Sequence, residues 1–335
     1  MKGFSAQITA LARLLVLVAG LLVAVGLAPL SAAFAQSDAG ASASPPAAPA
    51  RPAAKNADAQ PFAPDKVTFP SLDSGRTELT AWLLRPPGEE PRPAVVMMHG
   101  CSGLINPRGR MTALYRVWMR ALHARGYVVL NVDSASSRGF GQTCSAGPQR
   151  RTMWRDRSKD AYGALLWLQA QPFVRADRVA VMGWSQGGGA VLLSIAEPSI
   201  GRPPGLTSDF AAAVAFYPGA CNDVFQSKPW TAVEPNGWTT KTPLLVLFGA
   251  ADTWTPLPPC EAFLNGAKAR GVAVELVTYP DAAHAFDAPN VPRIELPQYR
   301  EGDRPTPVIE TNRAARADVF RRVPAFLEAQ LKRQQ

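Results

Sequence analysis

One pentapeptide constrains this chain more than any other part of its sequence. Residues 183–187 read GWSQG, which fits the nucleophile-elbow pattern G-x-S-x-G. An apolar run precedes it, and a Gly- and Ala-rich stretch of helical character follows it. A strand, a sharp turn and a helix in this order lift a serine hydroxyl clear of the backbone, where a base can take its proton. The alternative is a glycine-rich strand–helix connection with an incidental serine at position 185.

Of the three histidines in the chain, one suits the role of that base. His123 lies in residues 111–126, an apolar-periodic stretch that ends in glycine and is typical of a helix. His99 opens a small-residue loop, HGCSG, which favours an oxyanion hole because its glycine lets a backbone N–H approach a carbonyl. His284 follows the strand-like run 272–279, so we predict that it is the general base. The alternative is a loop histidine with structural partners only.

A carboxylate is needed to hold the imidazole in the right tautomer. Asp252 follows another apolar run and therefore leaves a strand end, as Ser185 and His284 do. The order Ser, Asp, His along the chain is that of α/β-hydrolases. Two other acids compete with Asp252 for this role: Asp281 is close in sequence to His284 for reaching around its ring, and Asp223 follows a different strand.

Taken together, these segments resemble the dienelactone hydrolase family of α/β-hydrolases. The resemblance runs from about Asp65 to the C-terminus. It is carried by four motifs: HGCSG at 99–103, GWSQG at 183–187, GAAD ending at Asp252, and HAF beginning at His284.

This resemblance implies an enzyme that cleaves esters or lactones, with its nucleophile, acid and histidine at the three positions named above. It also implies an oxyanion hole formed by the backbone N–H of Gln186 and by an N–H of the HGCSG loop, which we assign to Cys101. The namesakes of the family use a cysteine nucleophile where this chain has Ser185, which favours a broader carboxylesterase.

The fold expected from the pattern is α/β, with a mostly parallel eight-stranded sheet and helices on both faces. The first two strands form an antiparallel edge, and the three candidate catalytic residues follow carboxyl ends of strands, where such sheets bind ligands. Pro324 should kink or split the last helix. Strands are expected near residues 66–69, 79–84, 94–98, 127–132, 178–182, 211–217, 244–248 and 272–279, and helices near 111–124, 158–170, 186–196, 259–270 and 312–331.

The chain divides into three parts by composition. Residues 1–35 have the basic start, apolar core and small-residue end of a secretory signal, although an uncleaved membrane anchor is the alternative. Residues 36–64 are rich in Ala and Pro and predict a disordered linker. Residues 65–335 are sufficient for one hydrolase domain. We therefore expect a periplasmic or secreted protein with no stable membrane insertion after signal removal.

Four cysteines in an exported chain favour two disulfides. Three connectivities are possible. The loops that carry the cysteines follow neighbouring strands of the expected sheet, which favours Cys101 with Cys144 and Cys221 with Cys260. Four free thiols in a chain that stays in the cytoplasm are the alternative.

Charge and aromatic residues narrow the class of ligand. The net charge is +9, but no Lys/Arg block is interleaved with aromatics, so no nucleic-acid partner is expected. The segment after the fourth strand carries four arginines, any of which could bind a substrate carboxylate if the segment borders the pocket: Arg138, Arg150, Arg151 and Arg155. Arg138 is our candidate because it lies nearest the strand end. Trp184 and Trp254 adjoin the candidate site and are predicted to line an apolar pocket; core packing is the alternative.

The sequence therefore predicts a serine hydrolase that cleaves a small-molecule ester or lactone by two-step acyl transfer, without metal or organic cofactor. A peptidase of the prolyl-oligopeptidase type shares the fold and residue order, and an acyltransferase shares the first half of the reaction. A non-catalytic binding protein that keeps the fold is the remaining alternative.

Overall fold

The computed structural model describes residues 62–145 and 147–332, which belong to one compact unit. The expected signal segment and nearly all of the expected linker lie outside the described residues. Among the helices that are described, none combines the length and the apolar character needed to cross a bilayer.

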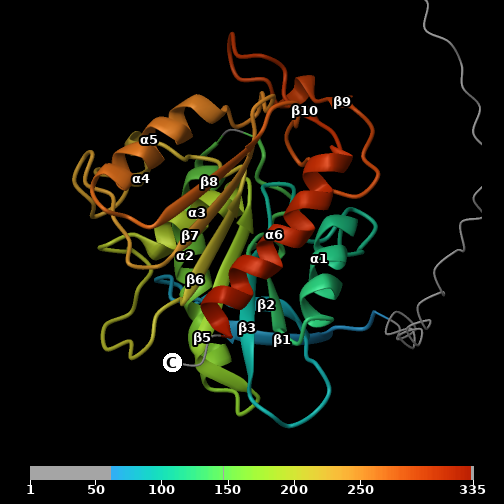
Figure 1. Ribbon diagram of the computed structural model, residues 1–335, viewed down its shortest axis with the longest axis vertical. Helices are drawn as coiled ribbons and strands as arrows, with labels where there is room; N and C mark the ends of the chain where they lie inside the picture. Colours follow the sequence, from blue (N-terminus) through green and yellow to red (C-terminus); the bar gives the residue numbers. More distant parts are fainter. Residues whose placement is uncertain (1–61, 146, 333–335) are drawn as a thin grey trace, which may run out of the picture. The chain divides into compact units, whose positions relative to one another are not determined.

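A single eight-stranded sheet forms the centre of the molecule, in the order β1-β2-β4-β3-β5-β6-β7-β8 (Figure 1). β1 pairs antiparallel with β2, β2 pairs antiparallel with β4, and all later pairings are parallel, as expected for this α/β fold. The strands are β1 (Asp65–Pro70), β2 (Glu78–Leu84), β3 (Arg92–Met98), β4 (Val128–Asp133), β5 (Val174–Trp184), β6 (Ala212–Phe216), β7 (Leu244–Gly249) and β8 (Val274–Tyr279).

Burial along the strands follows from their place in the sheet. Every residue of β4, β6 and β7 is buried, because helices cover both faces of a parallel sheet. β2, next to the antiparallel edge, alternates between buried and partly exposed residues. The continuous apolar runs in the sequence therefore mark the central strands, whose carboxyl ends carry the candidate site.

Helices lie on both faces of the sheet, again as expected. α1 and α6 lie side by side in front of it in Figure 1, where Trp118 stacks on Phe320 at a ring distance of 4.0 Å. α2 and α3 pack together behind it. The helices are α1 (Ala113–His123), α2 (Pro148–Gln169), α3 (Gln186–Ile195), α4 (Asp223–Gln226), α5 (Leu257–Ala269) and α6 (Arg313–Leu331), with short 3₁₀ turns η2 (Ser136–Arg138) and η3 (Pro297–Tyr299).

Three details differ from the sequence-based expectation. α2 begins at Pro148 rather than near residue 158, with the proline in the first turn, where its missing N–H is not needed. α6 continues through Pro324 without splitting, because buried apolar residues on both sides of the proline hold the helix on the sheet. A small hairpin of β9 (Ile294–Glu295) and β10 (Val308–Ile309) orders part of the long segment after β8.

The turn after β5 has the strained geometry expected of a nucleophile elbow. Ser185 has φ 52° and ψ −116°, a conformation that non-glycine residues rarely adopt. The flanking glycines allow close approach: a Cβ on Gly183 would lie 2.3 Å from the carbonyl oxygen of Gly187, and one on Gly187 would lie 2.2 Å from that of Met98. The elbow therefore packs backbone against backbone on the end of β3.

Candidate active site

The three expected residues emerge at one edge of the sheet. Ser185 follows β5, Asp252 follows β7 and His284 follows β8. β6 separates β5 from β7, and the parallel register of β5 through β8 brings the carboxyl ends of these strands to a common level. This edge is where open α/β sheets bind their ligands.

Asp252 and His284 form a buried, directly bonded pair. The Nδ1 atom of His284 lies 2.7 Å from Oδ2 of Asp252. The other carboxylate oxygen accepts the backbone N–H groups of Trp254 and Thr255 at 2.8 and 2.9 Å, and the hydroxyl of Thr255 donates to Oδ2 at 2.8 Å. These bonds hold the carboxylate beside Nδ1, across the ring from Nε2.

The competing acids have other surroundings. Asp223 begins α4, where its Oδ1 accepts the backbone N–H of Asn236, and Asp281 has an exposed side chain. Asp252 is thus the carboxylate that partners His284.

The imidazole of His284 contacts two residues that line the same cavity as Ser185. Its ring packs against the rings of Trp254 and Tyr217 at centroid distances of 5.0 and 4.5 Å. Trp254 and Thr255 line the same cavity as Ser185. Ser185 therefore lines the cavity itself, whereas His284 lies behind its wall residues Trp254 and Thr255.

This cavity has a volume of about 430 Å³ and an aromatic and prolyl wall. Its floor contains Ser185 and Gln186, beside Cys101. Asn222, Glu301 and Arg304 contribute polar side chains to the lining. The apolar wall consists of Trp154, Pro218, Phe225, Trp254, Pro256 and Pro259.

Gln186 and Cys101, the two residues expected to form an oxyanion hole, both line this cavity. Gln186 is the first residue of α3, so its N–H has no partner within the helix. In the HGCSG loop, the N–H of Gly100 donates to the Tyr115 hydroxyl at 2.7 Å and is already used. Cys101, the next residue, is the member of this loop that lines the cavity.

His99, which opens this loop, is unsuited to proton transfer in the cavity. It is fully buried, and its ring Nδ1 lies 2.6 Å from the carbonyl of Gly100. Burial and the nearby Arg157 charge hold the pKa of His99 well below its usual value. The ring is therefore neutral and structural.

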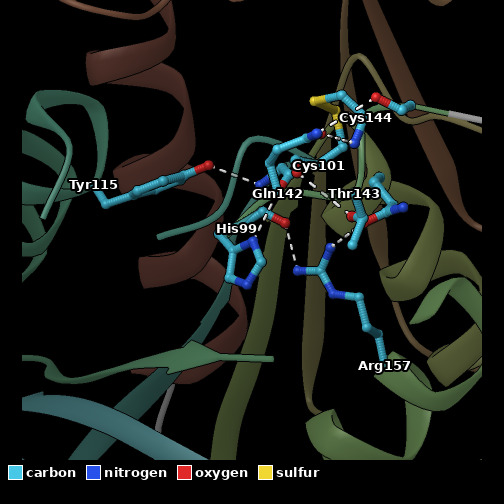
Figure 2. Close-up of a disulfide and its surroundings, with 10 residues drawn as sticks. His99, Cys101, Tyr115, Gln142, Thr143, Cys144 and Arg157 are labelled. Carbon is cyan, nitrogen blue, oxygen red and sulfur yellow. Dashed lines mark hydrogen bonds between the residues drawn. A yellow bond between two sulfur atoms is a disulfide. The ribbon is translucent and has the colours of Figure 1, made fainter. Parts of the chain in front are cut away.

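Both disulfides form in the connectivity that loop proximity favoured, Cys101–Cys144 and Cys221–Cys260. The first fastens the HGCSG loop to the segment that precedes α2 (Figure 2). Three of the four cysteines line the cavity. Across residues 62–145 and 147–332, no group of three or more His, Cys, Asp and Glu side chains is arranged to hold a metal ion.

Two sequence-based assignments of substrate contacts need correction. Arg138 is not among the cavity residues; its guanidinium donates to both oxygens of Asp160 at 2.7 and 2.9 Å and to Asp73 at 2.7 Å. The turn that carries it folds toward the β1–β2 edge, where its neighbour Ser137 accepts the backbone N–H of Thr80. Among the residues whose side chains are described, Arg304 is the arginine that lines the cavity.

Trp184 is the second correction. It is 1 % exposed, stacks on Phe216 at 5.3 Å, and donates its indole N–H to Asp287 at 2.9 Å. It is therefore a core residue beneath the site, whereas Trp254 lines the cavity as expected.

Sequence reasoning missed Asp287, a buried carboxylate that binds three aromatic side chains beneath the candidate site. Asp287, three residues after His284, accepts the indole N–H groups of Trp118 and Trp184 at 2.7 and 2.9 Å and the hydroxyl of Tyr217 at 2.7 Å. Burial raises the pKa of Asp287. Its donors are far apart along the chain, so nothing local in the sequence marks it.

The fold and this edge of the sheet define an α/β-hydrolase. The chain matches the family model of the dienelactone hydrolase family over residues 79–331, and it belongs to that family.

Curated relatives include both peptidases and a quorum-quenching protein. Dipeptidyl aminopeptidase BIII of Pseudoxanthomonas mexicana is 26% identical over 231 residues, which cover 60% of this chain and 31% of that protein. The quorum-quenching protein AidA of Acinetobacter baumannii (strain MDR-ZJ06) is 28% identical over 202 residues, 59% of this chain and 58% of the relative. The chain thus spans about a third of the length of the first of these relatives.

Solved structures share the fold. Thermogutta terrifontis esterase 2, phosphorylated by paraoxon, aligns with a TM-score of 0.54 at 18% identity, covering 80% of this chain and 96% of that one. Dipeptidyl peptidase 4 of Porphyromonas gingivalis aligns with a TM-score of 0.55 at 19% identity, covering 80% of this chain and 35% of that one.

The role of Asp287 gives a prediction about stability. Asp287→Ala leaves three buried donors without an acceptor and should lower the free energy of unfolding by roughly 3 kcal/mol or more. Asp287→Asn should cost less than half as much, because the amide oxygen still accepts both indole N–H groups and its NH₂ can donate to the Tyr217 hydroxyl. Urea denaturation followed by tryptophan fluorescence measures both. Equal losses in the two variants would contradict this account.

Proposed function

We propose that this chain is a serine hydrolase of carboxylic esters or lactones, with Ser185 as nucleophile, His284 as general base and Asp252 as the carboxylate that orients the imidazole. One observation carries the proposal: the 2.7 Å bond between Asp252 and His284 lies beside the cavity in which the strained elbow presents Ser185. Membership of a hydrolase family supports the same reading.

In the first step, Oγ of Ser185 attacks the carbonyl carbon while Nε2 of His284 takes the hydroxyl proton. The carbonyl oxygen becomes an oxyanion, which the N–H groups of Gln186 and Cys101 stabilise. As the tetrahedral intermediate collapses, the leaving alkoxide takes the proton from His284 and an acyl-enzyme remains.

In the second step, water takes the place of the alcohol. His284 removes a proton from the water as its oxygen attacks the acyl carbon, and the second tetrahedral intermediate expels Ser185, which regains its proton. Throughout, Asp252 keeps the proton-bearing Nδ1 directed away from the reacting atoms.

Variants of the three residues test this assignment. Ser185→Ala should remove nearly all turnover of a p-nitrophenyl ester and all labelling by a fluorophosphonate probe, and Asp252→Asn should lower kcat roughly 10³- to 10⁴-fold by favouring the wrong tautomer. The matched control is Asp281→Asn, the same substitution three residues from His284, which should leave kcat unchanged. Turnover that persists in Ser185→Ala would sink the assignment; so would failure of the wild type to be labelled, which is the outcome expected of a non-catalytic binding protein.

The cavity wall favours an apolar or aryl substituent on the ester. Phe225 packs edge-on against Trp154 at a ring distance of 5.8 Å, and Trp254 stacks on Tyr299 at 5.3 Å, so flat aromatic surfaces face the space beside Ser185. Burying an aryl or alkyl group against them contributes about 25 cal/mol per Å². We infer that uncharged aryl and medium-chain esters are preferred over small charged ones.

Phe225→Ala should therefore raise KM for a phenyl or hexanoyl ester about tenfold, the equivalent of losing 1.4 kcal/mol of apolar contact, with little change for an acetyl ester. Val224→Ala is the matched control, since Val224 is the neighbouring residue of α4, is 66% exposed and does not line the cavity. Steady-state kinetics on a graded ester panel measures the difference. An equal effect of the two variants would refute an aromatic substrate wall.

A peptidase is the second candidate, because a dipeptidyl aminopeptidase is among the relatives. The ester panel separates the two when aminoacyl and dipeptidyl p-nitroanilides are added to it. Turnover of anilides at rates equal to those of matched esters would favour the peptidase. Transfer of the acyl group to an added alcohol would favour an acyltransferase.

We also propose that the protein is exported, with residues 1–35 as a cleaved signal, 36–64 as a linker and 65–335 as the hydrolase domain. Two disulfides are consistent with an oxidising compartment outside the cytoplasm. Expression of the full chain in a Gram-negative host should give a periplasmic or secreted protein whose N-terminal sequence begins at Gln36. A mature protein that still begins at Met1 and stays with the membrane fraction would support the uncleaved anchor instead.

A further inference from the structure

A buried arginine lies behind the two N–H groups of the proposed oxyanion hole. Arg157 projects from α2 and is 0% exposed. Its Nη2 donates to the carbonyl of His99, and its Nη1 donates to the side-chain carbonyl of Gln186 at 3.1 Å. Figure 2 shows the guanidinium directed at the loop that carries His99 and Cys101. One side chain thus contacts both segments that supply the hole.

This guanidinium has neutral acceptors where a buried cation would ordinarily have a carboxylate. In the part of the chain that the structure describes, no carboxylate lies within 4.0 Å of it, and its Nε has no hydrogen-bond partner. Burial lowers the pKa of Arg157 to about 10, against the opposing influence of Asp160, Tyr115 and Asp133. Arg157 therefore remains a cation at neutral pH.

A buried, unpaired charge is costly for folding, typically by several kcal/mol. A preorganised charge directed at the position where an anion develops during a reaction stabilises that anion. In this chain such an anion would be the oxyanion of the tetrahedral intermediate, which would form against the N–H of Gln186. Arg157 binds the side chain of that same residue.

The surrounding bonds hold the hole rigid around this charge. Thr143 donates twice: its backbone N–H to the carbonyl of Cys101 at 2.7 Å, and its hydroxyl to the side-chain oxygen of Gln186 at 2.9 Å. Tyr115 accepts the N–H of Gly100, as described above, and the Cys101–Cys144 disulfide closes the loop (Figure 2). Arg157 is the member of this network that carries a charge.

We propose that Arg157 is a positioning residue for the oxyanion hole: it fixes the HGCSG loop relative to Gln186 and places a positive charge behind the Cys101 and Gln186 N–H groups, so that the oxyanion is stabilised more than the neutral carbonyl. This inference rests on the proposed serine-hydrolase function.

Arg157→Met removes the charge and both hydrogen bonds while keeping an unbranched apolar stem in the space. It should lower kcat about 10- to 100-fold, less than the 10²- to 10³-fold typical of deleting a donor that touches the oxyanion, and change KM less than about threefold. Arg157→Lys keeps the charge but cannot bridge both acceptors, and its kcat should lie between those of Arg157→Met and the wild type.

A pair of inhibitors separates oxyanion stabilisation from a general structural role. Ser185 adds to an aryl trifluoromethyl ketone, and the ketone oxygen becomes an oxyanion in the hole as the serine proton passes to His284. The corresponding trifluoromethyl alcohol fills the same cavity without forming that anion. In Arg157→Met the inhibition constant of the ketone should rise 10- to 100-fold, in parallel with the loss of kcat, while that of the alcohol stays within about threefold. Equal weakening of both compounds would show that the variant only disrupts the cavity, which overturns the proposal.

Arg138→Met is the control for loss of a largely buried arginine. Arg138 pairs with Asp160 and Asp73 and contacts neither oxyanion segment, so this variant should unfold more easily yet keep the wild-type kcat and ketone-to-alcohol ratio. If it loses as much ketone affinity as Arg157→Met, the effect is not specific to the hole. Should Arg157→Met fail to fold, Arg157→Lys carries the inhibitor test, and a ketone affinity equal to the wild type would overturn the proposal.

The two proposals fail differently. Wild-type protein without ester turnover, or turnover that survives Ser185→Ala, refutes the serine-hydrolase function. Serine-dependent turnover together with an unchanged kcat in Arg157→Met refutes only the role of Arg157.

Discussion

Contact between two stretches of backbone sets the position of everything at the carboxyl edge of the sheet. Gly187, two residues after the elbow serine, presses against the main-chain carbonyls of Met98 and His99, with no room for a side chain. This contact joins the start of α3 to the end of β3 and brings the HGCSG loop beside Ser185. The neighbouring strands then deliver Asp252 and His284 to the same level, because their register is parallel.

Much of this arrangement could be predicted because each candidate residue directly follows an apolar run that becomes a buried strand. Ser185, Asp252 and His284 were placed at one sheet edge from spacing and pattern alone, and their order along the chain is that of α/β-hydrolases. The disulfide connectivity followed from which loops adjoin in such a sheet. The catalytic roles themselves stay predictions until they are measured.

What could not be predicted depends on contacts between distant residues. Arg138 was the sequence-based candidate for a substrate contact, and nothing in the sequence singled out Arg157. The structure gives Arg138 two carboxylate partners and directs Arg157 at the carbonyl of His99 and the side chain of Gln186. In the sequence Asp287 looks like an ordinary acidic residue of a loop. Its role depends on three distant donors, Trp118, Trp184 and Tyr217, that only the fold brings to it. Pro324 predicted that the last helix would be kinked or split. α6 nevertheless runs unbroken through the proline, because buried apolar residues on both sides of it pack on the sheet.

Both disulfides join segments that border the cavity, and neither links two strands of the sheet. The core is maintained by apolar packing, whereas the walls around Ser185 are held by covalent cross-links. The arrangement of the loops around the cavity thereby depends on the oxidation state of four cysteines. Reduction of the two disulfides would therefore release the loops around the cavity, while the apolar contacts of the sheet and its helices would stay in place.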